Sequence, residues 1–328
     1  MTVIVVLLLL ELTARLIVTV VPNAAWEAHR HGFTTRGFPA LEQILVPDDK
    51  RFWSLEPGLV DHSLYGRMEP FPPMRFSVTT DSRGFRLTPN SAAAPRTVLF
   101  LGDSCTFGLG VDDDETVPAQ VQNGLHGVQV INAGVPGYTA YQGNVLLKEL
   151  APELDPDVAV ITFGFNDDLQ WDNRSDLEHA ETIVAQRSGL LARIRFIDLL
   201  RTILPGRGSE EPENPRPRLT DEEFEEQIRA MVRWSREHEI EPVLMAWPMA
   251  AQTVEPGASS KQRVLERVAA AEGVRLVSLV HVFRARGGTT LFRDAVHANP
   301  AGCRAAAGVL IPVLQEVLAQ ETAPTSAR

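Results

Sequence analysis

The chain has 328 residues, 44% of them hydrophobic, which is enough to bury one large core and to carry additional segments. Its formal charge at pH 7 is −11 and no basic cluster is visible, so a nucleic-acid partner is not expected. Cys105 and Cys303 are the two cysteines and form neither a Cys-x-x-Cys motif nor a metal-ligand spacing. We interpret them as two buried thiols rather than as a disulfide.

Residues 1–22 form an apolar segment that predicts a membrane anchor. Residues 2–21 are almost entirely apolar apart from Glu11 and Arg15, and a helix of about 20 residues is about 30 Å long, the thickness of a bilayer core. The two charges lie four residues apart and can pair on one helix face. A secretory signal peptide fits less well, because a basic start and a small-residue cleavage site are missing. An amphipathic helix packed on the domain remains an alternative.

Residues 23–95 are predicted to form an irregular extension that packs across the main domain. Prolines and aromatic residues are frequent here, as in Phe71-Pro72-Pro73. A short hairpin is expected around residues 76–80. The stretch Asp81-Ser82-Arg83-Gly84-Phe85-Arg86 is interpreted as a turn that carries one aromatic anchor. Small residues over 90–96 indicate a linker.

Residues 96–320 alternate short apolar runs with helical patterns, which is typical of a parallel sheet covered by helices on both faces. The expected strands are 97–101, 128–131, 158–163, 243–246 and 274–279. The expected helices lie near 115–124, 139–150, 221–238, 261–272 and 300–319. Asn299 as cap and Pro300 as first helical residue mark the start of the last helix. The pattern therefore predicts an α/β domain with a five-stranded parallel sheet in a three-layer αβα arrangement, followed by a tail at 321–328.

Residues 170–220 interrupt this alternation as a long insertion. Its end, over 205–217, is rich in proline, glycine and charge. Long connections of this kind in compact domains are usually functional loops. We interpret the insertion as a lid or surface loop.

The acidic run at 112–115 is interpreted as a helix start, where the helix dipole favours negative charge, rather than as a metal site. Four histidines are expected to be ordinary surface or core residues: His126, His179, His238 and His281.

The first strand of the α/β domain ends in a serine turn. Gly102-Asp103-Ser104 follows it directly, so the Ser104 hydroxyl is expected at the carboxyl edge of the sheet, where ligands bind in open α/β folds. Capping of the next helix is the alternative role for a serine at this place. A nucleophilic serine would also need a base, a group that orients the base, and donors for an oxyanion.

Later strand ends supply candidates for each of these parts. Gly134 and Gly137 follow the second strand, and a glycine lets the backbone approach a ligand with its N–H. Asn166 follows the third strand, and its carboxamide can donate to an oxyanion. Asp294 lies three residues before His297, so it can hold the imidazole while the other ring nitrogen takes the serine proton.

In order along the chain, four blocks resemble the motifs of the SGNH (GDSL-type) hydrolase family: Gly102-Asp103-Ser104, Gly137, Gly164-Phe165-Asn166-Asp167 and Asp294-x-x-His297. The resemblance covers about residues 97–318. It implies the flavodoxin-like strand order 2-1-3-4-5 and an enzyme that needs neither a cofactor nor a metal.

The resemblance also implies a role for each matching residue. Ser104 would be the nucleophile, His297 the base and Asp294 its partner. The oxyanion hole would consist of the Ser104 N–H, the Gly137 N–H and the Asn166 side chain, with Gly137 preferred to Gly134.

Two features depart from the family pattern. Cys105 replaces the usual leucine after the serine, which we expect to be catalytically neutral. The insertion at 170–220 exceeds a minimal member and leaves the size of the substrate open. The apolar N-terminal segment and the turn at 81–86 are similar to those of membrane-anchored bacterial members, which implies an extracytoplasmic catalytic domain.

The resulting hypothesis is a serine esterase that cleaves a carboxylic ester of a small molecule, a glycan or a lipid, with O-acetyl groups on a glycan as one example. An O-acyltransferase that uses the same acyl-enzyme on Ser104 is the alternative. A catalytically silent binding protein is a third hypothesis, which an intact set of catalytic residues disfavours.

Overall fold

A computed structural model describes residues 6, 9–13, 38–48, 50–170, 174–181, 216–255 and 257–321. Most of the predicted membrane anchor at 2–21 lies outside these residues, and so does most of the predicted lid at 170–220. The division of the chain into an anchor, an extension, a hydrolase domain and a tail stays a prediction.

The centre of the molecule is a sheet of five parallel strands, in the spatial order β6-β5-β7-β8-β9. In chain order this is 2-1-3-4-5, so the predicted topology is confirmed. Every observed strand overlaps the run expected for it: β5 (Arg96–Gly102), β6 (Val128–Gly134), β7 (Val158–Thr162), β8 (Glu241–Ala246) and β9 (Arg275–Ser278).

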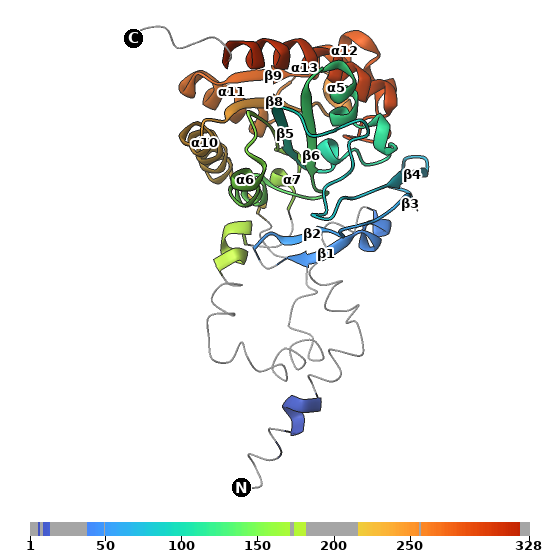
Figure 1. Cartoon of the computed structure of the whole chain (residues 1–328). Helices are drawn as coiled ribbons and strands as arrows, with labels where there is room; N and C mark the ends of the chain where they lie inside the picture. The colour runs from blue at the N-terminus through green and yellow to red at the C-terminus, as the bar shows by residue number, and fades with distance from the viewer. Residues whose placement is uncertain are drawn as a thin grey trace.

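Helices cover both faces of this sheet, because its central strands are apolar on both sides (Figure 1). Successive side chains of a strand point to opposite faces. Leu99 and Leu101 therefore pack under α6 (Ala140–Leu154), α10 (Asp221–Glu237) and α11 (Ser260–Glu272). Their neighbours Val98 and Phe100 pack on the other face, under α5 (Val117–Gly124), α12 (Val280–Arg286) and α13 (Pro300–Glu321). The predicted three layers are confirmed; the short α12 was not expected.

The last helix is part of the core. Among the described residues, α13 is long and apolar enough to cross a membrane by length and composition. Its Ala306, Leu310 and Leu314 side chains are fully buried against the sheet, as in the core helix of a globular domain. The Asn299 Oδ1 accepts hydrogen bonds from the N–H groups of Ala301 (3.0 Å) and Gly302 (3.1 Å), so the predicted helix start is confirmed.

The described part of the extension is more regular than expected. β1 (Leu45–Asp48) pairs with β2 (Phe52–Leu55), and β3 (His62–Gly66) pairs with β4 (Met74–Val78), both antiparallel. The strand expected near residues 76–80 exists as β4, but its partner lies before it along the chain rather than after a turn within 76–80. Apolar side chains of these strands, with Trp53 and Phe76 among them, belong to the same core as one face of the large sheet.

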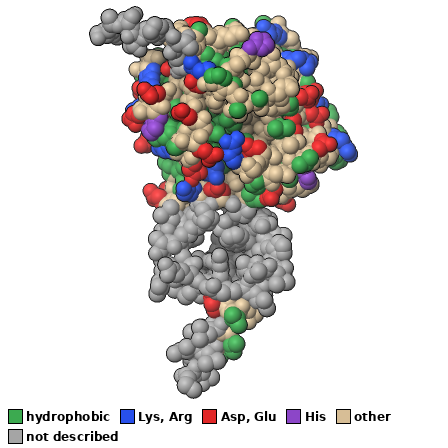
Figure 2. All heavy atoms as spheres, viewed as in Figure 1, with side chains coloured by type: hydrophobic (Ala, Val, Ile, Leu, Met, Phe, Trp, Pro, Cys, Tyr) green, Lys and Arg blue, Asp and Glu red, His purple; other side chains and the backbone are tan. Residues whose placement is uncertain are grey.

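Acidic and basic side chains are interspersed on the face of the molecule that Figure 2 shows. Arg229 pairs with Glu225 (2.9 Å) along α10 and with Glu272 of α11. These side chains are 22–26% exposed, and ion pairs that remain in contact with solvent add little to stability, typically about 0–1 kcal/mol. The surface charges therefore contribute mainly to solubility, and the buried core carries the stability of the fold.

Replacement of Asn299 by alanine should destabilise the fold by about 1 kcal/mol, because the first N–H groups of α13 would lose their acceptor. Urea denaturation of the two proteins measures this difference. Asn299→Asp is the matched control: like the alanine it loses the hydrogen bond from the Asn299 Nδ2 to the Thr290 oxygen (2.7 Å), but its carboxylate keeps the cap acceptor, so it should lose less stability than Asn299→Ala. Equal losses in both variants would contradict the capping role.

Candidate active site

Ser104 lies at the tip of a tight turn between β5 and a short helix, α4 (Ser104–Phe107). Asp103 caps this helix, since its Oδ1 accepts a hydrogen bond from the Cys105 N–H (2.8 Å). A Cβ on Gly102 would lie 2.1 Å from the Thr106 Oγ1, so only glycine fits beneath the turn. The Ser104 side chain sits at the carboxyl edge of the sheet with 7% of its surface exposed, recessed but accessible.

His297 connects Ser104 to Asp294. The His297 Nε2 lies 2.7 Å from the Ser104 Oγ, and its Nδ1 lies 2.7 Å from the Asp294 Oδ2. The other oxygen of Asp294 accepts hydrogen bonds from the N–H groups of His297 (2.8 Å) and Val296 (2.9 Å). The structure therefore brings together the three side chains that the spacing of the motifs singled out.

The charge of Asp294 determines which nitrogen of a neutral His297 ring carries the proton. Burial acts to raise the pKa of the Asp294 carboxyl, but the hydrogen bonds from the His297 ring and from two backbone N–H groups outweigh it and hold the pKa below its ordinary value. An ionised carboxylate only accepts hydrogen bonds, so the proton of a neutral His297 ring sits on Nδ1. The Nε2 then accepts from the Ser104 hydroxyl, which is the arrangement that a general base requires.

Two glycines follow β6, and they differ in the availability of their N–H groups. The Gly134 N–H donates to the Asn132 Oδ1 (3.1 Å), and a Cβ on Gly134 would lie 2.3 Å from the Phe107 N. Gly137 has φ +80°, a conformation that favours glycine, and its N–H has no acceptor in the described part of the chain. Of the two, Gly137 has the N–H that is available to a ligand.

Asn166 connects the serine turn to the loop that carries Gly137. It lies on α7 (Phe165–Asp168), directly after β7. Its Nδ2 donates to the Asp103 Oδ2 (3.2 Å) and to the Tyr138 backbone oxygen (3.1 Å). The ends of the three adjacent strands β6, β5 and β7 are thus joined through one carboxamide.

Asp167, for which the sequence indicated no role, is fully buried beside this network. Its Oδ1 accepts a hydrogen bond from the N–H of Ala140 (2.8 Å), and its Oδ2 has no partner among the described residues. Burial raises the pKa of this carboxyl to about 7, although the Ala140 N–H and the charges of Arg218 and Lys261 act in the opposite direction. Asp167 therefore titrates near neutral pH instead of in its ordinary acidic range.

Both cysteines are free and buried. The Cys105 Sγ lies 3.8 Å from the Val296 oxygen, behind the loop that carries His297. Burial raises the pKa of the Cys105 thiol well above its ordinary value, and it raises that of Cys303 to about 12. Both side chains are therefore neutral thiols that fill space.

Arg86, the last residue of the turn at 81–86, was not expected to matter for the site. It is fully buried, and its guanidinium donates to the backbone oxygens of Phe107 (2.9 Å) and Gly108 (2.7 Å), at the end of the serine helix α4. Its Nε donates to Asp113 (2.8 Å), which assigns part of the acidic run at 112–115 to this contact.

The described residues hold no group of three or more His, Cys, Asp or Glu side chains that could bind a metal.

Trp53, Asp176 and Arg218 also contact the site without having been expected there. All three are fully buried behind the loop that carries Gly137. They come from the extension and from the two ends of the insertion, and no pattern in a single sequence marks a tryptophan or an ion pair in such segments as part of a distant site.

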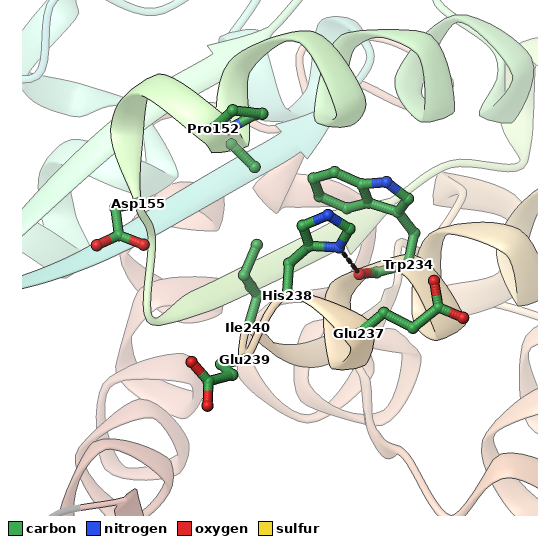
Figure 3. A pocket seen from close by; sticks show the side chains of 8 residues that line it. Pro152, Asp155, Trp234, Glu237, His238, Glu239 and Ile240 are labelled. Carbon is green, nitrogen blue, oxygen red and sulfur yellow. Dashed lines mark hydrogen bonds between the residues drawn. The ribbon is translucent and has the colours of Figure 1, made fainter.

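A pocket of about 310 Å³ lies at the other edge of the sheet, between the ends of α6 and α10 (Figure 3). Asp155 and Ile240, which line it, precede β7 and β8, so the pocket opens at the amino ends of the strands. The His238 ring stacks on Trp234 there, with ring centroids 3.8 Å apart. None of the predicted site residues lines this pocket.

Comparison with known proteins connects this geometry to one family. The GDSL-like lipase/acylhydrolase family matches residues 100–305. Esterase TesA of Pseudomonas aeruginosa is 32% identical over 100 residues, which are 29% of this chain and 50% of that protein. The chain thus matches about half the length of this relative.

Two solved structures are similar in fold. The crystal structure of TesA is 20% identical with a TM-score of 0.47, and the match covers 68% of this chain and 99% of that one. The lipase/acylhydrolase from Enterococcus faecalis is 20% identical with a TM-score of 0.45, and the match covers 67% and 96%.

Asp167→Asn should become more stable relative to the wild type as the pH rises. Because the pKa of Asp167 is raised in the folded state, the unfolded chain releases this proton at a lower pH, and the wild-type stability falls between about pH 4 and about pH 7. The asparagine keeps the acceptor for Ala140 but does not ionise. Urea denaturation at about pH 4.5 and about pH 7.5 should show a relative gain on the order of 1 kcal/mol or more. A difference that does not depend on pH would contradict the burial of a protonated carboxyl.

Proposed function

The chain belongs to the GDSL-like lipase/acylhydrolase family and is a hydrolase, and we propose that it cleaves a carboxylic ester through an acyl-enzyme on Ser104. The observation that carries the proposal is the hydrogen-bonded row Asp294–His297–Ser104, with 2.7 Å at each of its two side-chain contacts. A serine hydroxyl, a base and an orienting carboxylate in this order are the parts of a nucleophilic serine site.

In the first half of the reaction, the Ser104 Oγ attacks the ester carbonyl while the His297 Nε2 takes its proton. The ring becomes positively charged, and the ionised Asp294 on its other side stabilises that charge. His297 then returns the proton to the departing alcohol, which leaves the acyl group on Ser104. In the second half, His297 takes a proton from water, the resulting hydroxide attacks the acyl group, and the acid leaves as Ser104 recovers its proton.

Three donors would stabilise the negative oxygen of each tetrahedral intermediate. The Ser104 N–H is the first of helix α4 and has no acceptor within the helix. The Gly137 N–H has no acceptor in the described part of the chain, whereas that of Gly134 is occupied. The Asn166 Nδ2 spans the two loops and would redirect one of its two hydrogens to the oxyanion.

We also infer that the N-terminal segment anchors the enzyme in a bacterial membrane with its catalytic domain outside the cytoplasm, where a glycan or lipid ester would be its substrate. The described part of this segment supports an apolar environment: residues 9–13 are helical, and Leu9 and Leu12 are 57% and 66% exposed. Two exposed leucines on so short a helical stretch are more stable in lipid than in water.

Transfer of the acyl group to a sugar hydroxyl is the alternative reaction at the same site. Ser104 and His297 are only 7% and 3% exposed, and a recessed acyl-enzyme favours an acceptor that fits the site over bulk water. The hydrogen-bonded row Asp294–His297–Ser104 argues against a catalytically silent binding protein, since binding alone does not need these three side chains in contact.

Hydrolysis of p-nitrophenyl acetate and p-nitrophenyl butyrate by the full chain tests the proposal. Ser104→Ala should abolish turnover and should unfold at the wild-type urea concentration, because the change removes one recessed hydroxyl. Turnover by Ser104→Ala at the wild-type rate would refute the nucleophile. Turnover that appears only when a sugar acceptor is added would favour the transferase.

Asn166→Ala should lower kcat by about 10²–10³, as expected for the loss of one oxyanion donor, with a much smaller change in KM. Asn144→Ala is the matched control: Asn144 is also a buried asparagine, but its Nδ2 donates to Gln227 (2.8 Å), away from the serine turn. Kinetics on p-nitrophenyl butyrate should therefore separate the two variants. An equal fall in kcat for both would argue against the oxyanion role.

A further inference from the structure

The loop that carries Gly137, residues 136–138, is held on all three of its backbone oxygens. Each oxygen accepts a hydrogen bond from a side chain of a different segment: Pro136 from the Trp53 Nε1 (2.9 Å), Gly137 from the Arg218 Nη1 (2.6 Å) and Tyr138 from the Asn166 Nδ2 (3.1 Å). Of these donors, only Asn166 belongs to the four motifs. The other two come from the extension and from the end of the insertion.

The planarity of the peptide bond links these contacts to the oxyanion donor. The Pro136 oxygen and the Gly137 N–H belong to one trans peptide, so they lie in one plane and point in opposite directions. A donor that fixes the Pro136 oxygen therefore also fixes the direction of the Gly137 N–H. The next peptide plane is fixed in the same way through the Gly137 oxygen. With both planes held, Gly137 is kept at φ +80°.

We propose that Trp53 and Arg218 are positioning residues that aim the Gly137 N–H at the oxyanion of the reaction. The inference rests on the proposed function, since it assumes that Gly137 is an oxyanion donor. It assigns to the extension and to the insertion a role in the catalytic rate, although neither Trp53 nor Arg218 would touch the substrate.

Trp53, on β2, is bound to the loop in both directions. Its Nε1 donates to Pro136, and its own backbone oxygen accepts from the Tyr138 hydroxyl (2.7 Å). The rings of Trp53 and Tyr138 pack edge to face with centroids 6.1 Å apart, and both side chains are fully buried. Neither residue has room to shift without moving the peptide that carries the Gly137 N–H.

Arg218 is fixed by a buried ion pair. Its Nε and Nη2 donate to the two oxygens of Asp176 (3.0 and 2.7 Å), and both side chains are fully buried. Its Nη2 also donates to the Gln142 Oε1 (2.9 Å), on the helix that follows the loop. The guanidinium carbon lies 5.6 Å from the centre of the Trp53 ring. The fork geometry of the guanidinium allows these contacts at the same time, which one ammonium group would not.

The two ends of the insertion meet at this ion pair. The Asp176 N–H donates to the Arg218 backbone oxygen (2.9 Å). The Arg218 N–H donates to the oxygen of the residue that caps α7 (3.0 Å), and the Leu219 N–H donates to the Asp167 oxygen within α7 (3.1 Å). Buried ion pairs are poor stabilisers compared with apolar residues of similar size, because both charges lose their hydration. Packing alone does not require a charged side chain at this position. Orienting the Gly137 oxygen does require a donor, and the Arg218 guanidinium supplies it.

The test uses the full chain with two conservative substitutions. Trp53→Phe keeps an aromatic ring but deletes the donor to Pro136, and Arg218→Lys keeps the charge opposite Asp176 but loses the fork. We expect each change to lower kcat on p-nitrophenyl butyrate by about 10-fold or more, with KM within about 2-fold of wild type. The second-order rate of Ser104 labelling by a fluorophosphonate should fall with kcat, because its phosphoryl oxygen occupies the same oxyanion hole.

Two measurements separate positioning from general destabilisation. The pH dependence of kcat should keep the wild-type shape, because neither residue contacts His297. Trp234→Phe and Arg229→Lys are matched controls. Trp234 lines the distant pocket of Figure 3, and Arg229 forms ion pairs on α10 with Glu225 and Glu272. Both controls should keep the wild-type kcat and labelling rate.

Wild-type kcat in folded Trp53→Phe and Arg218→Lys would overturn the proposal. If Arg218→Lys does not fold, Trp53→Phe and Tyr138→Phe provide the test, because each deletes one hydrogen bond of the loop without changing a charge. Normal kcat in both variants overturns the proposal. A lower kcat in both supports it. Failure of the proposed function is distinct, because the wild-type protein itself would then resist labelling at Ser104 and would not hydrolyse the ester.

Discussion

Backbone oxygens at the carboxyl edge of the sheet need donors, and two buried guanidinium groups supply several of them. Arg86 donates to the backbone at the end of the serine helix, and Arg218 donates to the Gly137 oxygen. Unpaired buried carbonyl groups would destabilise these irregular turns. A guanidinium carries five N–H donors in one plane, so a single side chain holds several carbonyls at once. The loops of the site thus keep one conformation through contacts with segments outside the sheet.

The sheet provides the alignment on which these contacts act. β6, β5 and β7 are adjacent and parallel, so the chain segments that follow them leave the sheet at the same edge. Asn166 then joins the neighbouring turns through Asp103 and Tyr138. His297 comes from beyond the fifth strand and reaches the same place through α12 and the turn before α13. The adjacency of the strands brings the turns together, and the hydrogen bonds set their distances.

Burial has different consequences for the carboxyl groups around this edge. Asp294 is compensated by the His297 ring and two backbone N–H groups, so it stays ionised beside the base. Asp167 has one N–H donor and lies deeper, and its pKa rises to about 7. Asp176 lies 2.7 Å from the Arg218 guanidinium. Burial raises the pKa of each carboxyl and hydrogen-bond donors lower it, so the balance between the two sets the pKa of Asp294 and of Asp167.

The sequence by itself determined the strands, the principal helices, the parallel topology and the residues from which a serine hydrolase site would be built. These features are local: apolar runs of strand length, a proline after a capping asparagine, and four motifs in a fixed order. Only the tertiary structure showed that Trp53, Arg86, Asp176 and Arg218 surround that site, because their contacts join residues far apart in the chain. A single sequence does not distinguish a buried arginine from an exposed one. The burial of Arg86 and Arg218 depends on the backbone oxygens that the fold places around each guanidinium.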